Sequence, residues 1–366
     1  MFKRYNAMKA VVLRGPFRFE MVELPRPVPR EDEVLIRVKV VGICGSDVRY
    51  FLGENPWALH TLGRDLKETK SFILGHEVSG EIVETGKWVK SSRVSERVGV
   101  LAFKGCEECY YCKRGFQNLC EHTLHIGHDG RWGDVDYPPG GYAEYMQIWA
   151  NNAYRLPDNV SYEEATQLDG LAVAIHANNR AGVSPTENVV TIGCGAIGLM
   201  VSQVARIRGA SKIIALDTRD KPLEKAEALG VDHVINVKKN KNFVDEVLKL
   251  TQGIGANVVF DTVGSNETVK AGLSMLARMG RLIMLAVTPV KIELNLTDLV
   301  GGERVLTCSA NHLYEDYVVG VELLASGKVK VKPFITHIMK LEEYKEAFNM
   351  LLHKEDYDVI KIVLKP

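Results

Sequence analysis

Four cysteines gathered within residues 106–120 are the most specific chemical signal in this chain. Cys106, Cys109, Cys112 and Cys120 lie in a stretch with little helical or strand pattern of its own. Four thiolates so closely spaced suit a closed tetrahedral zinc site, which leaves no position for substrate, so we expect a structural role. An iron–sulfur cluster also uses four cysteines. Disulfides fit less well, because seven cysteines is an odd number and a cytoplasmic chain keeps its thiols reduced.

A second set of metal donors is spread along the chain and has a mixed composition. Cys44 follows an apolar strand pattern, His76 and Glu77 follow a polar loop, and Asp169 comes before a nucleotide-binding pattern. A thiolate, an imidazole and a carboxylate leave zinc an open fourth position, which is the arrangement of a catalytic site. Each residue alone has a plainer interpretation: a small buried cysteine, a core histidine, a helix cap. Their joint occurrence favours the metal site.

A glycine-rich turn between a strand and a helix predicts a dinucleotide site. The apolar run 189–192 leads into Gly193, Gly195 and Gly198, and a helical pattern beginning with Ala196 and Ile197 follows. Gly193 would make the tight turn, Gly195 would let the pyrophosphate approach, and Gly198 would let helix and strand pack closely. The helix N-terminus offers its free amides to the phosphates. The alternative is that the glycines serve only a structural turn.

The end of the next strand bears on the choice of cofactor. Asp217 lies about twenty residues beyond the glycines, where a carboxylate accepts hydrogen bonds from the adenosine ribose and repels a 2′-phosphate. NAD is therefore favoured over NADP. Arg219 leaves NADP open, because an arginine at this place can stack on adenine or bind that phosphate.

The elements that must position these residues fall into two patterns. The first part of the chain alternates apolar and polar residues in short runs, which predicts a mostly antiparallel, barrel-like unit with strands over 9–13, 33–41, 78–85, 97–101 and 142–148. Buried strands over 189–192, 212–216, 233–236, 257–260 and 281–285 then alternate with helices over 196–208, 221–229 and 243–251, which predicts a parallel sheet covered on both faces. Helices over 313–326 and 342–353 and a strand over 359–364 are expected to return to the first domain. We therefore place one α/β domain at 159–310 and the other at 1–158 and 311–366.

The bulk composition excludes several classes of protein. The 366 residues carry 46 basic and 46 acidic side chains, so no net charge attracts nucleic acid or an anionic membrane. The first residues contain no apolar run of signal-peptide length, and no window approaches the ~20 continuous apolar residues of a membrane span. We expect a soluble cytoplasmic protein that binds neither nucleic acid nor membrane.

Together these motifs resemble the zinc-containing medium-chain dehydrogenase/reductase family over roughly residues 8–366. The resemblance rests on Cys44-Gly45-Ser46-Asp47, Gly75-His76-Glu77-x2-Gly80, the four-cysteine stretch, Gly140-Gly141-Tyr142-Ala143-Glu144-Tyr145 and the glycine turn. The segments around 44–50 and 169–177 look most like the polyol (sorbitol) dehydrogenase branch. The resemblance implies a GroES-like catalytic domain, a doubly wound Rossmann cofactor domain, one catalytic and one structural zinc, and a homodimer or homotetramer.

The same resemblance assigns roles to single residues. Cys44 and His76 match zinc ligands, and Asp47 matches an acid that orients His76. Glu77 matches a carboxylate that ligates in some members only, while Asp169 matches a third-ligand position held by Cys, Asp or Glu. The implied reaction transfers a hydride between a secondary alcohol and NAD, with the Ser46 hydroxyl accepting the substrate's proton.

Departures from the family pattern concern the proton relay and the substrate. Arg49 stands where many alcohol dehydrogenases have a histidine, so we expect the relay to end elsewhere, on the NAD ribose hydroxyl and water. Arg49 could instead pair with the carboxylate of a sugar acid, remain solvated or contact the cofactor phosphate. The polar loop 53–71, with Trp57, His60 and Arg64, suits a small hydroxylated substrate. Alternatives are a threonine-type or simple secondary-alcohol dehydrogenase, a zinc-free reductase and a non-catalytic nucleotide-binding protein.

Overall fold

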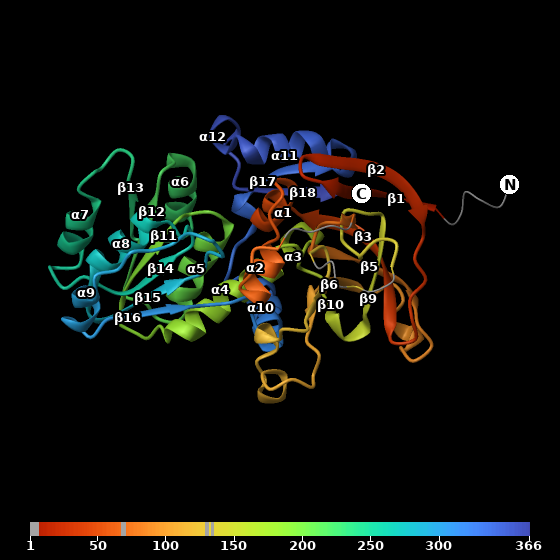
Figure 1. Ribbon diagram of the computed structural model, residues 1–366, viewed down its shortest axis with the longest axis horizontal. Helices are drawn as coiled ribbons and strands as arrows, with labels where there is room; N and C mark the ends of the chain where they lie inside the picture. Colours follow the sequence, from red (N-terminus) through yellow and green to blue (C-terminus); the bar gives the residue numbers. More distant parts are fainter. Residues whose placement is uncertain (1–6, 67–70, 129–131, 133–134) are drawn as a thin grey trace. The chain divides into compact units, whose positions relative to one another are not determined.

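The computed structural model describes residues 7–66, 71–128, 132 and 135–366. The chain forms two compact units, one of Met1–Asp169 with Ile335–Pro366 and the other of Gly170–Phe334 (Figure 1). These divisions differ from the boundaries expected at 158/159 and 310/311. Residues 1–6 lie outside the described residues, and so do residues 67–70, which belong to the expected polar loop.

The first unit is built on antiparallel strands rich in Val and Ile. Its larger sheet has the strand order β10-β6-β5-β3-β18-β17, with β9 also paired to β3, and β2-β1-β4 form a second sheet. Only β17 and β18 run parallel among these described pairs. The strands are β1 (Ala7–Gly15), β2 (Arg18–Pro25), β3 (Glu33–Gly42), β4 (Phe72–Ile73), β5 (Glu77–Thr85), β6 (Arg97–Val100), β9 (Tyr145–Trp149), β10 (Ala153–Arg155), β17 (Ile335–Lys340) and β18 (Lys361–Lys365). This confirms the GroES-like, mostly antiparallel domain.

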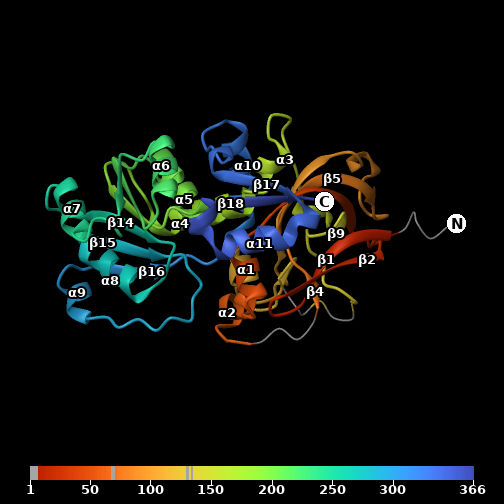
Figure 2. The ribbon, with the colours of Figure 1, turned by 90° about the horizontal axis from the view of Figure 1, so that it is seen from above.

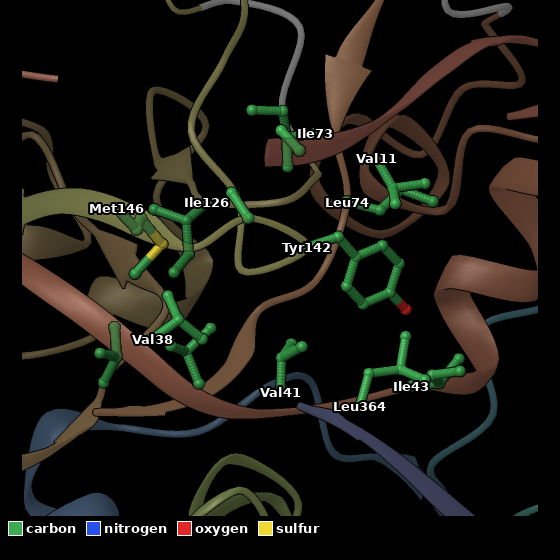
Figure 3. Packing of buried hydrophobic residues seen from close by; sticks show 14 of the residues in the cluster. Val11, Val38, Val41, Ile43, Ile73, Leu74, Ile126, Tyr142, Met146 and Leu364 are labelled. Carbon is green, nitrogen blue, oxygen red and sulfur yellow. The ribbon is translucent and has the colours of Figure 1, made fainter. Parts of the chain in front are cut away.

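The core of this unit lies between its sheets. Figure 3 shows the Tyr142 ring among the apolar side chains of Val11, Ile43, Leu74 and Leu364, all of them buried. These residues come from widely separated parts of the chain, so burial of their apolar surface joins the N-terminal and C-terminal segments. Gly75 allows the approach, because a Cβ there would lie 2.6 Å from the Tyr142 ring and its φ is +91°.

The second unit is a six-stranded parallel sheet with the order β13-β12-β11-β14-β15-β16. Its strands are β11 (Asn188–Ile192), β12 (Lys212–Asp217), β13 (His233–Asn236), β14 (Ala256–Asp261), β15 (Leu276–Met284) and β16 (Val305–Cys308). Figure 2 shows helices α5 (Ala196–Ile207) and α6 (Asp220–Ala228) on one side of the sheet and α8 (Asn266–Met275) on the other. This strand order is that of a doubly wound Rossmann domain, so the expected fold class is confirmed.

The remaining helices connect or cover these sheets. In the first unit they are α1 (Gly45–Phe51), α2 (Pro56–Leu62), α3 (Tyr162–Ala165), α11 (Tyr344–Leu352) and α12 (Lys354–Tyr357). In the second unit they are α7 (Phe243–Leu250), α9 (Leu296–Val300) and α10 (Tyr314–Ala325), while α4 (Leu168–Ala181) begins in the first unit and continues into the second. None of the helices in the described part of the chain combines the length and apolar character needed to span a bilayer.

Two expectations about the elements were wrong. The segment 53–71 is not simply a polar loop, because Asn55 caps α2 through the Ala58 amide and Trp57 is buried in the core. Helix α10 does not return to the first domain. Asp316 on α10 accepts hydrogen bonds from His176 and Asn179 on α4, at 2.9 and 2.8 Å, which ties α10 to the second unit.

Candidate functional site

The four-cysteine stretch forms a compact lobe closed at its base by a short hairpin, β7 (Phe103–Lys104) with β8 (Leu124–His125). The sulfur atoms of Cys106, Cys109, Cys112 and Cys120 all lie within 4.8 Å of one another. Gly105 allows this convergence, since a Cβ there would lie 2.9 Å from the Cys112 sulfur. All seven cysteines of the sequence lie in the described residues, and their thiols are free. The predicted cluster is therefore brought together without a disulfide.

The backbone of this lobe directs N–H groups at its sulfurs. The Cys109 amide donates to the Cys106 sulfur at 3.3 Å and the Cys112 amide to the Cys109 sulfur at 3.4 Å. Amides of Glu108 and Cys109 lower the pKa of the Cys106 thiol to about 6, whereas burial raises the pKa of Cys112 to about 12. Cys106 therefore ionises easily, whereas Cys112 needs a nearby cation to ionise. This combination fits a metal site with four thiolate ligands.

The second donor set converges where β3 ends and β5 begins. Cys44 caps the N-terminus of α1 just after β3, and His76 comes directly before β5. Gly42 pairs with Glu77 across these antiparallel strands, which brings the two segments side by side. Ligand atoms of Cys44, His76 and Glu77 all lie within 4.8 Å of one another. Sequence reasoning named all three residues, and the sheet register explains why they meet.

Asp47 lies on one side of the His76 ring, at Nδ1. Its Oδ2 accepts hydrogen bonds from the Cys44 amide and the Tyr142 hydroxyl, both at 2.9 Å. Its Oδ1 lies 3.6 Å from His76 Nδ1, and neither of these two buried atoms has a hydrogen-bond partner among the described residues. A proton on Nδ1 pointing to Asp47 leaves the Nε2 lone pair available for a metal. Burial and the Asp47 charge raise the pKa of Tyr142 well above its usual value, so its hydroxyl stays a donor.

The two candidate carboxylates lie in different surroundings. Asp169 Oδ2 is 3.9 Å from His76 Nε2, the nitrogen that faces away from Asp47. Glu77 instead forms a buried ion pair with Lys361 of β18, whose ammonium donates to Oε1 at 2.6 Å. Burial raises the pKa of Glu77, and the Lys361 charge opposes that rise. Lys361 was missed by sequence analysis, because nothing local connects a C-terminal lysine with residue 77.

Two further histidines beside His76 were also missed. The Ser46 hydroxyl is 2.9 Å from His128 Nε2, and the His128 ring centroid lies 4.2 Å from that of His76. His125 stacks on His128 with 4.4 Å between ring centroids. Both histidines follow or end β8, at the base of the cysteine lobe. The sequence signal was the His125-x2-His128 spacing, but its distance from residue 46 along the chain hid the contact.

Arg49 has a partner of its own. Its Nε donates to Glu54 Oε2 at 2.6 Å, and a second guanidinium nitrogen contacts the same oxygen. The side chain is 23% exposed, so it lies packed along α1 and the turn that follows.

In the second unit the three glycines of the turn between β11 and α5 have different surroundings. Gly193 has a φ of +89°, and a Cβ at Gly198 would lie 1.9 Å from the Gly193 carbonyl oxygen. Gly195, which caps α5, has open space where its Cβ would be. Two glycines therefore serve the turn and the packing, and the third leaves room for a ligand at the helix N-terminus, ahead of Ala196 and Ile197.

Asp217 closes this turn from the end of β12. Its Oδ2 accepts from the Cys194 amide at 2.7 Å and its Oδ1 from the Arg219 amide at 2.9 Å. The carboxylate is thus fixed beside the glycine turn. Sequence analysis missed the loop after β14, where the Asp261 carboxylate accepts from the Val263 and Gly264 amides and the Thr262 hydroxyl donates to the Ile192 carbonyl at 2.9 Å.

Comparison with known proteins extends over both units. A family model described as an alcohol dehydrogenase GroES-like domain matches residues 30–158, and one described as a zinc-binding dehydrogenase matches residues 196–326. Sorbitol dehydrogenase of Bacillus subtilis is 31% identical over 362 residues, which cover 98% of this chain and 97% of that protein. The chain belongs to the zinc-containing medium-chain dehydrogenase/reductase family.

Other members of this family place it among the zinc-type polyol and alcohol dehydrogenases. L-Threonine 3-dehydrogenase of Pyrococcus furiosus is 32% identical over 348 residues, covering 94% of this chain and 95% of that protein. An alcohol dehydrogenase of Escherichia coli CFT073, solved in complex with NADH, has a TM-score of 0.86 and 26% identity over 99% of this chain and 100% of its own. The medium-chain dehydrogenase resemblance drawn from the motifs is confirmed, and this chain is an oxidoreductase of that family.

Proposed function

We propose that this chain is a zinc-dependent dehydrogenase that transfers a hydride between a secondary hydroxyl of a polyol or sugar and NAD. The observation that carries the proposal is the convergence of Cys44, His76 and Glu77, with Asp169 Oδ2 3.9 Å from His76 Nε2. Membership of the polyol and alcohol dehydrogenases supports the reaction class.

The donor set of the first unit fits a catalytic zinc. Cys44, His76 and one carboxylate would hold the ion, and zinc supplies a Lewis acid that lowers the pKa of a bound hydroxyl. The lone pair on His76 Nε2 faces Asp169, while Asp47 holds the opposite nitrogen. Glu77 is charge-compensated by Lys361. We therefore propose Asp169 as the third zinc ligand. Glu77 then serves as the counter-charge of the buried Lys361 ammonium.

A second zinc would occupy the cysteine lobe. The four sulfurs provide a complete tetrahedral set, so they leave no position for substrate and serve to hold the lobe together. The lobe also carries His125 and His128 at its base, and the His128 ring contacts that of His76. Disruption of the lobe would therefore also disturb the catalytic donor set.

The protein groups around the substrate hydroxyl handle its proton and its orientation. Ser46, on the first turn of α1 two residues from Cys44, takes the proton of the substrate hydroxyl as it passes a proton on toward solvent. Asp47 keeps His76 in one tautomer, which holds the donor set in a fixed geometry before substrate arrives.

The second unit would bind the nicotinamide cofactor, which supplies the hydride acceptor. Amides at the start of α5 bind the pyrophosphate, and Asp217 accepts hydrogen bonds from the adenosine ribose. A fixed carboxylate there disfavours a 2′-phosphate, which supports NAD rather than NADP.

A polyol or neutral sugar is the substrate class that we favour. The relatives include sorbitol dehydrogenases, and the Arg49 guanidinium is engaged with Glu54 rather than offered to a substrate carboxylate. A sugar acid would have to share the Arg49 guanidinium with Glu54, which makes it the less favoured substrate.

The decisive experiment combines metal analysis with a substrate panel. We expect two zinc ions per chain and NADH formation at 340 nm with polyols, and we expect Ser46→Ala to lower kcat by about 10²-fold or more. Asp217→Ala should weaken the binding of NAD and raise the activity with NADP relative to that with NAD. The proposal is wrong if the zinc-loaded chain oxidises no polyol, sugar or amino alcohol.

Threonine is the second candidate substrate, because L-threonine 3-dehydrogenases are among the relatives at 32% identity. It requires the same hydride transfer from a secondary alcohol but a pocket that accepts an ammonium and a carboxylate. Turnover of L-threonine at a higher kcat/KM than any polyol would select it.

A further inference from the structure

A serine and a histidine from distant parts of the chain meet beside the metal donors. Ser46 lies on the first turn of α1, and its Oγ is 2.9 Å from Nε2 of His128, which follows β8. The backbone at His128 is tied to the same helix, because the Tyr50 hydroxyl donates to the His128 carbonyl at 2.7 Å. Tyr50 is itself buried and also bonds Asn55 at 3.1 Å. Both ends of the Ser46–His128 contact are therefore held by the fold.

The His128 ring is buried against two other histidine rings. The residue is 9% exposed and contacts the rings of His76 and His125 at 4.2 and 4.4 Å between centroids. An imidazole nitrogen that carries no proton can accept a hydrogen bond from a hydroxyl.

We propose that His128 is the positioning residue for Ser46: its Nε2 accepts the Ser46 O–H, so that the serine oxygen presents its lone pairs to the substrate hydroxyl. This inference rests on the proposed function, because it gives a partner to the serine that takes the substrate proton. A hydroxyl with no such partner rotates among its staggered positions and competes with the substrate as a donor.

The other candidate for this role on α1 is unsuitable. Arg49 lies three residues after Ser46, but its guanidinium has no acceptor atom and is paired with Glu54. The cysteine lobe thus provides, through His128, the hydrogen-bond acceptor for Ser46 that α1 lacks. The lobe then has a second purpose besides its own stability, since it presents an acceptor to the serine.

The test uses two amides that differ by one methylene group. The His128→Gln side chain reaches about as far as Nε2 and can accept the Ser46 hydrogen bond, whereas His128→Asn ends short of it. We expect His128→Asn to lower kcat by about 10- to 100-fold with little change in KM. His128→Gln should recover kcat to within about 5-fold of the unchanged chain. In a Ser46→Ala background both substitutions should have no further effect on kcat.

Zinc content and NADH binding are measured on every variant, with His353→Asn, an exposed histidine on the first unit, as the control that keeps full activity. The role of His128 is overturned if His128→Asn retains the kcat of the unchanged chain, or if its effect multiplies with that of Ser46→Ala. It is also overturned if Gln and Asn reduce kcat alike. An unchanged chain that binds zinc and NADH but oxidises no alcohol removes the proposed function itself, which is a different result.

Discussion

At the scale of single residues, His76 stands between two carboxylates that lie on opposite nitrogens of its ring. Asp47 lies at Nδ1 and Asp169 at Nε2, with distances of 3.6 and 3.9 Å. An imidazole that donates to one acid from Nδ1 can bind a metal only through Nε2. The nitrogen that each carboxylate faces therefore distinguishes their proposed roles: Asp47 orients the His76 ring, and Asp169 binds the metal.

The ligand assignment makes a direct prediction about zinc. Asp169→Asn should reduce the zinc content toward one ion per chain, because an amide oxygen without charge is a weaker donor beside Cys44 and His76. The double variant Glu77→Gln with Lys361→Met, which removes both charges of the buried pair, should retain two. Zinc is measured by elemental analysis after dialysis against a mild chelator. The opposite pattern, with loss in the double variant only, would make Glu77 the ligand.

Lys361 and Glu77 predict a large effect of one substitution on stability. Both side chains are at most 7% exposed, so Lys361→Met leaves a buried carboxylate uncompensated and should lower the free energy of unfolding by ~3–5 kcal/mol. The double variant with Glu77→Gln should regain most of that loss. Urea unfolding gives both values.

Lys365→Met serves as the control on the same strand. Lys365 pairs with Glu163 on the surface, with side chains 46% and 26% exposed, and should change stability by less than ~1 kcal/mol. Equal losses for Lys361→Met and Lys365→Met would contradict the importance of the buried pair.

The donors that sequence analysis found share a local signal. Cys44 and His76 each lie at a strand end within a short motif, and the register of β3 with β5 then brings them together. Lys361 and His128 lack such a signal, because their partners lie 284 and 82 residues away in sequence. Their roles follow only from tertiary packing.

At the scale of elements, the pairing of α4 with α10 corrects a domain boundary and has a pH signature. Burial by itself would raise the pKa of Asp316, but hydrogen bonds from His176 and the Leu313 amide hold that pKa below its usual value. A carboxylate with a depressed folded pKa adds stability above its unfolded pKa of ~3.9 and loses it as the pH falls through the folded value.

Asp316→Asn should therefore lower the free energy of unfolding at pH 7 by ~1–3 kcal/mol, and this difference should shrink below pH ~4. Urea unfolding at several pH values measures it. Glu315→Gln, on an exposed neighbour in the same helix, is the control and should show no such dependence. A difference that stays constant with pH would mean that the loss comes from packing and not from the charge.

Most elements could be predicted from the sequence because their periodicity is strong. The buried runs of β11, β12 and β14 and the amphipathic helices between them agree with the predicted ranges to within a few residues. Helix α2 was missed because it is short, and Trp57 in a polar segment gives no helical period. The edge strands β2 and β16 contain no fully buried residue, and both were missed.

At the scale of the whole molecule, the two units divide the chemistry. The metal donors and the Ser46–His128 pair belong to the first unit, and the glycine turn with Asp217 belongs to the second. Each unit has its own sheet and its own core. Loss of one binding function should therefore leave the other intact.

Chelation tests this division. Removal of zinc with dipicolinate should abolish turnover while NADH still binds with unchanged affinity, measured by its fluorescence, and added zinc should restore activity. Gly198→Val is the reciprocal variant: a side chain there would meet the Gly193 carbonyl at 1.9 Å, so NADH binding should be lost and zinc retained. NADH affinity that fell together with zinc content would show that the units depend on each other.

The place of β18 in the first sheet has a consequence for biosynthesis. This strand lies between β3 and β17, carries Lys361, and follows the whole second unit in sequence. A ribosome therefore delivers residues 170–334, a continuous stretch able to form its own core, before the strand that completes the sheet begun by residues 1–169. Until then Glu77 lacks the Lys361 counter-charge, and Val41 and Gly42 at the end of β3 lack the strand that pairs with them. The first unit is therefore the last part of this chain whose sheet can be completed during synthesis.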